Sequence, residues 1–298
     1  MAYIINNAKW VSDKKVKQAS ILVKQDRIQA IRKSFDRYRY MKMDVSPFIM
    51  TPVHVMCDNA LPETVNHKMM KDYFIEHFIS KGCTTLLTSF KIDFFHHFQE
   101  RLRQKKKTLL NSPIDYLLGA VAPASLITSE LVRLCKKHKI PIIWIDLSSR
   151  DSFLNIKWGW IKDVLFHYPI IFAPFFSSEI DNNSKAKELK IWQKTMKSEN
   201  IPHFSKEISQ KTPLSLEELK KLGIYPKRGN FLVGGEVSYN LYEIPEVISV
   251  DDNWSIDYDS HCPRLTINKG KLYKVNNQTF YYPGEGKELI INTPRFFI

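Results

Sequence analysis

Two side chains stand where α/β proteins place catalytic groups, at the ends of predicted strands. His54 comes at the end of an apolar run, and an imidazole can bind a metal ion or transfer a proton. Asp146 comes at the end of another apolar run, residues 140–147, and is the acidic residue with a catalytic position. Two other interpretations remain open. His54 could pack beneath the strand ends, and Asp146 could bond a loop residue such as Ser148 or Arg150.

The elements that must position these groups follow a β/α pattern. Residues 46–90 read as a strand, a long amphipathic helix and a second strand after the turn at Lys81-Gly82, which is one β/α unit. The pattern continues with strands at 114–121, 140–147 and 169–175, and helices at 92–106, 128–138, 158–165, 184–198 and 215–222. A complete eight-stranded barrel takes about 250 residues. The pattern predicts a parallel α/β fold. Because only five strands can be assigned, the (β/α) barrel of the TIM type that the resemblance described below implies should be reduced or partly open.

Both ends of the chain have a different pattern. Residues 3–33 alternate apolar and polar positions and break at Asn6-Asn7, Ser12-Asp13 and Gln25-Asp26. Such a pattern predicts short antiparallel strands joined by tight turns. Residues 264–273 read as a further strand, turn and strand.

Four motifs, in this order, resemble the metal-dependent amidohydrolase superfamily, which includes dihydroorotase, hydantoinase and N-acetylglucosamine-6-phosphate deacetylase. They are the N-terminal strands, the segment Gly82-Cys83-Thr84-Thr85, the Gly, aromatic, Pro and basic pattern of residues 222–235, and the final hairpin. The resemblance implies a composite β-sandwich domain from residues 1–47 and 222–298. It also implies a shortened barrel domain from residues 48–221.

The same resemblance implies a metal site, held by a His-x-His pair on the first barrel strand, a middle-strand Glu or carboxylated Lys, later histidines and an aspartate base. His54 matches the first histidine, and Asp146 is the candidate catalytic acid or base. Met56 stands in place of the second histidine, and Val121 and Pro123 replace the metal-binding residues of the third strand. At least three protein ligands are needed to hold a catalytic ion. We therefore expect no cofactor, or a divalent metal such as zinc if the protein is active.

Two functions follow from this degraded ligand set. The first is a pseudoenzyme that serves as a binding, regulatory or structural subunit. The alternative is a divergent metal-dependent hydrolase of non-peptide C–N bonds in amides, cyclic amides or N-acetyl groups. Lost barrel strands would expose a sheet edge, which favours a homo-oligomer or a protein partner that covers it. One aromatic group predicts core packing or, alternatively, an apolar pocket for a small-molecule ligand. It consists of Trp144, Trp158, Trp160, Phe172, Phe175 and Phe176.

Composition narrows the partners and the compartment. The net charge is +13, but the basic residues are spread along the chain. The densest runs, 101–107 and 136–139, read as solvated helix ends, with a patch for phosphate or an anionic partner as the alternative. We do not expect nucleic acid or a membrane as a partner, and we expect a cytoplasmic protein. The four cysteines lack a CxxC spacing, which predicts free thiols.

Overall fold

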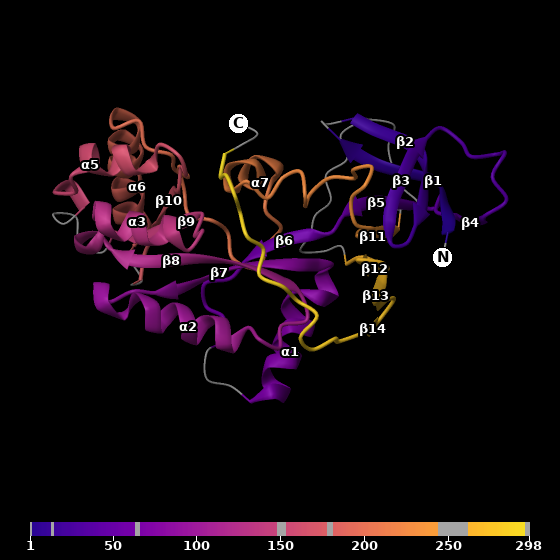
Figure 1. The fold of residues 1–298 in the computed structure, drawn as a ribbon, viewed down its shortest axis with the longest axis horizontal. Coiled ribbons are helices and arrows are strands. Elements are labelled where there is room, and N and C mark those ends of the chain that lie inside the picture. Colours follow the sequence, from indigo (N-terminus) through magenta and orange to yellow (C-terminus); the bar gives the residue numbers. More distant parts are fainter. Residues whose placement is uncertain are drawn as a thin grey trace.

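Five parallel strands form the centre of the molecule, in the spatial order β10-β9-β8-β7-β6 (Figure 1). This computed structural model describes residues 2–12, 15–62, 66–147, 153–177, 181–243 and 262–295. The parallel strands are β6 (His54–Cys57), β7 (Cys83–Lys91), β8 (Asp115–Pro123), β9 (Ile142–Asp146) and β10 (Ile171–Phe175). The predicted α/β class and the five predicted strands are confirmed, and the sheet curls as a half-barrel.

Helices follow these strands as the sequence predicts, and several of them begin at a capping side chain. They are α1 (His67–His77), α2 (Phe98–Thr108), α3 (Ser129–Lys137), α5 (Trp158–Leu165), α6 (Asn182–Ser198) and α7 (Leu216–Leu222). The Thr128 side chain accepts from Leu131 N at the start of α3, and Ser215 and Glu218 form a reciprocal capping box on α7. Such caps satisfy backbone N–H groups that have no partner within the helix.

The two faces of the parallel sheet belong to two separate cores. On β9, Ile143 and Ile145 point into the core that contains residues of α1, α2, α3, α5 and α6, whereas Ile142 and Trp144 point to the opposite, concave face. We call the apolar cluster on the concave face the inner core. Its strand residues are Val55, Cys57, Leu87, Leu117, Val121, Ile142, Trp144, Ile171 and Ala173. Its other residues are Phe204, Ile208, Leu214, Leu219, Leu222, Ile224 and Ile291. The later part of the chain therefore fills the concave face of the half-barrel.

One segment, residues 202–214, contacts both outer strands of the parallel sheet. Phe172 N in β10 donates to Pro202 O at 2.9 Å, and Phe204 N donates back to Phe172 O at 2.9 Å. At the other edge, Leu214 N donates to Val55 O in β6 at 2.8 Å. The segment thus satisfies backbone groups at both edges, which otherwise would attract another strand. An oligomer or a protein partner at these edges stays a prediction.

Strands from both ends of the chain are hydrogen-bonded into one nine-stranded sheet, and the predicted β-sandwich is not confirmed. The order is β14-β13-β12-β11-β5-β1-β2-β3, with β4 on β1. Its strands are β1 (Ala2–Ser12), β2 (Lys15–Lys24), β3 (Arg27–Arg32), β4 (Met41–Asp44), β5 (Phe48–Pro52), β11 (Tyr239–Glu243), β12 (Leu265–Asn268), β13 (Lys271–Val275) and β14 (Gln278–Thr279). The predicted break at Asn6-Asn7 is a bulge within β1, with Asn7 at φ 57°. β5 also belongs to this sheet, although the sequence placed residue 48 at the start of the barrel domain.

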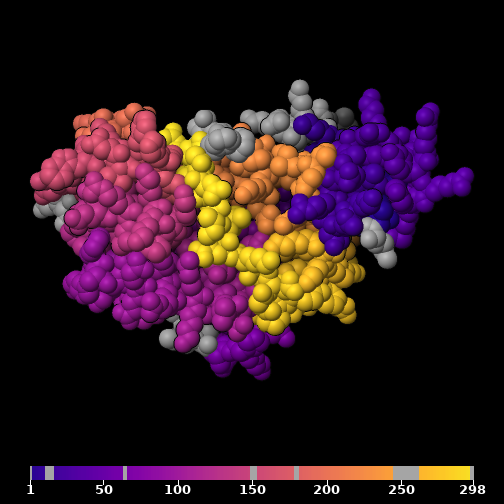
Figure 2. All heavy atoms as spheres, viewed as in Figure 1, coloured from indigo at the N-terminus to yellow at the C-terminus, as the bar shows by residue number. Residues whose placement is uncertain are grey.

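The C-terminal segment returns from the nine-stranded sheet to the parallel sheet and runs across the surface to α7 (Figure 2). Tyr116 N donates to Lys287 O at 3.0 Å, and Leu289 N donates to Tyr116 O at 2.7 Å. These bonds lie beside β8 before its pairing with β9 begins at Ala120. Gly286 permits the close approach, because a Cβ there would lie 1.9 Å from Ile114 O.

Two expectations from composition can be compared with the described residues. Cys57, Cys83 and Cys135 are free and buried, and Cys262 is free and exposed, so the predicted free thiols are confirmed. Among the described residues, no helix combines the length and the hydropathy needed to span a lipid bilayer.

Candidate functional site

His54 lies at the opposite end of its strand from the one the sequence predicts. It is the first residue of β6, and its backbone N–H donates to Gly82 O at 3.0 Å. The imidazole is buried, and its Nε2 lies 2.6 Å from the hydroxyl of Tyr242 in β11. The prediction was wrong about position because the apolar run divides at Val53 into two strands that belong to different sheets. His54 joins the two sheets at the amino end of β6.

Burial of His54 predicts a stability that depends on pH. Desolvation lowers the pKa of His54 from 6.5 to about 4. In that interval the unfolded chain binds a proton that the folded chain excludes, so stability falls as the pH falls. We expect wild type to lose about 2 kcal/mol relative to His54→Gln between about pH 7.5 and 5. Urea unfolding of both proteins at several pH values measures this difference, and equal pH slopes would contradict it.

The carboxyl end of β6 presents Cys57 and Asn59 instead of histidines. Cys57 is the last residue of the strand, points into the inner core and is completely buried. Burial raises the pKa of its thiol, so that the group stays protonated at neutral pH. Gln210 holds both residues, because its Nε2 lies 3.7 Å from Cys57 Sγ and its Oε1 accepts from Asn59 N at 2.8 Å.

The carboxylate between them, Asp58, is also used within the protein. Its Oδ2 accepts from the Tyr73 hydroxyl at 2.5 Å, and its Oδ1 accepts from Ala60 N at 2.9 Å. Tyr73 lies on α1, so this carboxylate anchors the helix that follows the strand. Burial and then the hydrogen bond to Asp58 raise the pKa of Tyr73.

Asp146 is the last residue of β9, as predicted, and pairs in register with Pro123 and Phe175. Strand alternation puts it on the same face as Trp144. Its predicted partners Ser148 and Arg150 lie outside the described residues. Since Asp146 lies at the carboxyl end of the sheet and His54 at the amino end, the structure does not bring the two candidates together.

The described side chains at the ends of β6 and β9 do not form a ligand set for a catalytic metal ion. The described part of the chain contains no group of three or more His, Cys, Asp or Glu side chains that could hold one. At the end of β6, a protonated thiol and two carboxamides are poor ligands compared with imidazole and carboxylate. In the sequence, the i, i+2 spacing of Cys57 and Asn59 could have indicated the carboxyl end of β6, because this spacing places both side chains on one face.

A pocket of about 590 Å³ opens at the carboxyl ends of β6, β9 and β10. It is lined by Asn59, Ala60, Trp144, Pro174, Phe175, Phe176, Leu189, Lys206, Glu207, Ile208, Ser209 and Gln210. We call it the strand-end pocket. Asn59 Nδ2 is buried and has no hydrogen-bond partner among the described residues. Glu207 forms an ion pair with Lys185. The pocket therefore combines aromatic walls with an amide donor that lacks an acceptor.

Comparison with solved structures identifies the fold. No family model matches the chain, and no curated protein matches it in sequence. A D-hydantoinase superposes with a TM-score of 0.68 at 12% identity, over 99% of this chain and 100% of that one. A dihydropyrimidinase from Brevibacillus agri NCHU1002 has a TM-score of 0.59 at 11% identity, over 98% and 99% of the two chains. The L-hydantoinase from Arthrobacter aurescens has a TM-score of 0.58 at 12% identity, over 97% and 99%. The amidohydrolase resemblance seen in the sequence is confirmed at the level of the fold.

Proposed function

We propose that this chain, which has the fold of the hydantoinases, is a non-catalytic binding subunit that uses the strand-end pocket to hold a small ligand. One observation carries the proposal. The end of the first parallel strand, where the family resemblance implies metal-binding histidines, presents Cys57 and Asn59 fixed by Gln210.

The inner core supports a non-catalytic role. A metal-dependent hydrolase needs an ion that activates a water molecule, together with open space for that water and the substrate. Here Phe204, Ile208 and Leu214 pack against the strand residues on the concave face. The apolar packing extends to Cys57 at the strand end, so hydrolysis would need ligands that the described residues do not bring together.

The lining of the strand-end pocket suggests the class of ligand. Phe175 and Phe176 are partly exposed and provide aromatic surface that suits a small planar ring, and Trp144 is buried in the same lining. Asn59 Nδ2 can donate to a carbonyl oxygen, and burial without an acceptor is costly, so a ligand acceptor there is favourable. The structural neighbours are called hydantoinases and a dihydropyrimidinase, which makes hydantoin and a dihydropyrimidine the first probes.

Binding without turnover is the expected result. We expect calorimetry to detect binding of hydantoin or a dihydropyrimidine, and chromatography to show that the ring stays closed. Asn59→Ala should weaken binding about fivefold, because one hydrogen bond is worth roughly 1 kcal/mol. The matched control is Asn292→Ala, which changes an exposed asparagine outside the pocket. Equal affinities of Asn59→Ala and Asn292→Ala would contradict the assignment of the pocket.

Elemental analysis tests the non-catalytic half of the proposal. Protein purified without chelator and supplemented with zinc or manganese should contain far less than one metal ion per chain. Stoichiometric metal together with ring opening of either probe would overturn the proposal in favour of a divergent hydrolase. His54→Ala should leave the metal content unchanged, because His54 lies at the amino end of β6.

A further inference from the structure

A second pocket lies at the opposite, amino end of the parallel sheet. Its volume is about 310 Å³, and its lining begins with Ile171, the first residue of β10. The other lining residues come from the end of α6, the loop after it, the end of α7 and the C-terminal segment. They are Met196, Lys197, Asn200, Ile201, Pro202, His203, Ser205, Lys221 and Arg295. We call this the basic pocket, and it shares no residue with the strand-end pocket.

The described charged side chains that line the basic pocket are all basic. Lys197, Lys221 and Arg295 line it, and none of its described lining residues carries a carboxylate. Lys221 Nζ pairs with Glu217 at 2.7 Å, but that carboxylate belongs to an exposed side chain on α7. Neither Lys197 nor Arg295 forms an ion pair with any described residue. A concave site with charges of one sign concentrates the electrostatic field and attracts the opposite ion.

His203 also lines the basic pocket, and its pKa is affected by the same positive charges. Its Nδ1 lies 2.8 Å from Ile201 O, so this nitrogen carries the proton and donates to the carbonyl. Burial lowers the pKa of His203, and the positive charges of Lys221, Arg295 and Lys197 lower it further. An anion in the pocket would reverse this effect, because it favours the imidazolium form.

The positive charge exceeds what the neighbouring helices require. Lys197 and Lys221 lie in the last turns of α6 and α7, where a cation offsets the negative end of the helix dipole. Arg295 belongs to neither helix. Its backbone N–H donates to Lys221 O at 3.0 Å, which fixes the C-terminal segment beside α7. Arg295 therefore adds a guanidinium from a separate segment. Arginine is the residue type whose planar guanidinium best matches the oxygens of a phosphate group.

We propose that the basic pocket binds the phosphate group of a small phosphorylated molecule. Lys197 and Arg295 donate charge-assisted hydrogen bonds to its oxygens, and His203 adds a donor when protonated. A volume of about 310 Å³ suits a phosphate or pyrophosphate group with a small organic part. This proposal does not depend on the proposed ligand of the strand-end pocket.

Calorimetric titration with pyrophosphate and inorganic phosphate tests the proposal. We expect wild type to bind pyrophosphate, and Lys197→Gln/Arg295→Gln to bind it at least about tenfold more weakly, since two charge-assisted hydrogen bonds are lost. The matched control is Lys190→Gln/Lys194→Gln, which removes the same net charge from exposed positions of α6 outside the pocket. Because all four side chains are exposed, we expect both variants to fold.

Three results of these titrations would overturn the phosphate site. They are the absence of phosphate or pyrophosphate binding by wild type, an equal loss of affinity in the control variant, and equal binding of succinate and pyrophosphate. NMR of the histidine ring protons gives the location. Pyrophosphate should raise the pKa of His203 in wild type and leave it unchanged in Lys197→Gln/Arg295→Gln. A pKa of His203 that does not respond in wild type would place the anion elsewhere and also overturn the proposal.

Discussion

Trp144→Ala should lower the free energy of unfolding by about 3–5 kcal/mol, the range measured for large aromatic side chains removed from protein cores. Trp144 is 1% exposed and lies on the concave face of β9 within the inner core. It packs so closely on β8 that a Cβ added at Gly119 would lie 2.2 Å from Trp144 Cζ3. Alanine would leave a cavity that the neighbouring backbone cannot fill, because a sheet collapses little around a missing ring.

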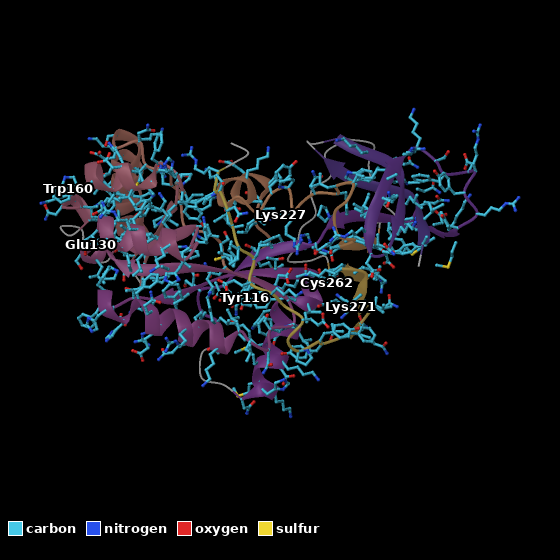
Figure 3. The ribbon with its side chains drawn as sticks, viewed as in Figure 1. Tyr116, Glu130, Trp160, Lys227, Cys262 and Lys271 are labelled. Carbon is cyan, nitrogen blue, oxygen red and sulfur yellow. The ribbon has the colours of Figure 1, made fainter. Side chains whose placement is uncertain are left out.

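Urea unfolding monitored by circular dichroism measures this effect. The control is Trp160→Ala on α5, because Trp160 is 68% exposed and lies at the outer end of the molecule (Figure 3). We expect that variant to change stability by less than about 0.5 kcal/mol. If the two substitutions had equal effects, the concave face would not be packed as the inner core requires, and the argument against a catalytic cavity would fail.

Trp144 also connects the fold to the proposed function. The same residue fills the inner core and lines the strand-end pocket. The floor of the pocket is therefore the top of the packed concave face rather than an open barrel interior. A ligand held there meets aromatic surface and an amide, and reaches no cluster of metal ligands among the described residues.

The sequence predicted the regular part of this fold well because the signals are local. Residues 140–147 form a continuous apolar run, which is typical of a parallel strand buried on both faces. The structure has β9 there, with Ile143 and Trp144 buried on opposite sides. The helices after each strand have apolar periodicity and capping residues such as Thr128, which fix their ends within a few residues.

The parts that the sequence did not predict depend on contacts between distant residues. Phe204, Ile208 and Leu214 are separated by polar residues without a helical or strand period, so nothing local shows that they fill the concave face. Val53 looks like the middle of one apolar strand, yet it separates β5 from β6. That break places His54 at the amino end of its strand, not at the carboxyl end that the sequence predicted.

Asp115→Asn should also destabilise the protein strongly, by about 3 kcal/mol at neutral pH, because breaking a buried ion pair leaves uncompensated charge. Asp115 is the first residue of β8 and its side chain is 5% exposed. Its Oδ2 lies 2.6 Å from Arg228 Nη2, and its Oδ1 lies 2.7 Å from Lys269 Nζ. Lys287 N also donates to Oδ1 at 3.0 Å. One carboxylate therefore joins the parallel sheet to three later segments of the chain.

The pH dependence of this effect separates charge from shape. Burial by itself would raise the pKa of Asp115, but Lys269, Arg228 and the backbone N–H of Lys287 together hold it below its ordinary value of 3.8. A carboxylate with a lowered folded pKa contributes stability above the unfolded pKa and loses it as the pH falls through the folded value. The difference in unfolding free energy between wild type and Asp115→Asn should therefore be constant from about pH 7 to 5 and shrink below about pH 4.

Lys271→Gln is the control, since it removes an exposed ion pair with Glu285 and should cost less than about 1 kcal/mol. A difference for Asp115→Asn that did not change with pH would mean that asparagine misfits by shape, and that the carboxylate charge does not hold the C-terminal segments on the parallel sheet.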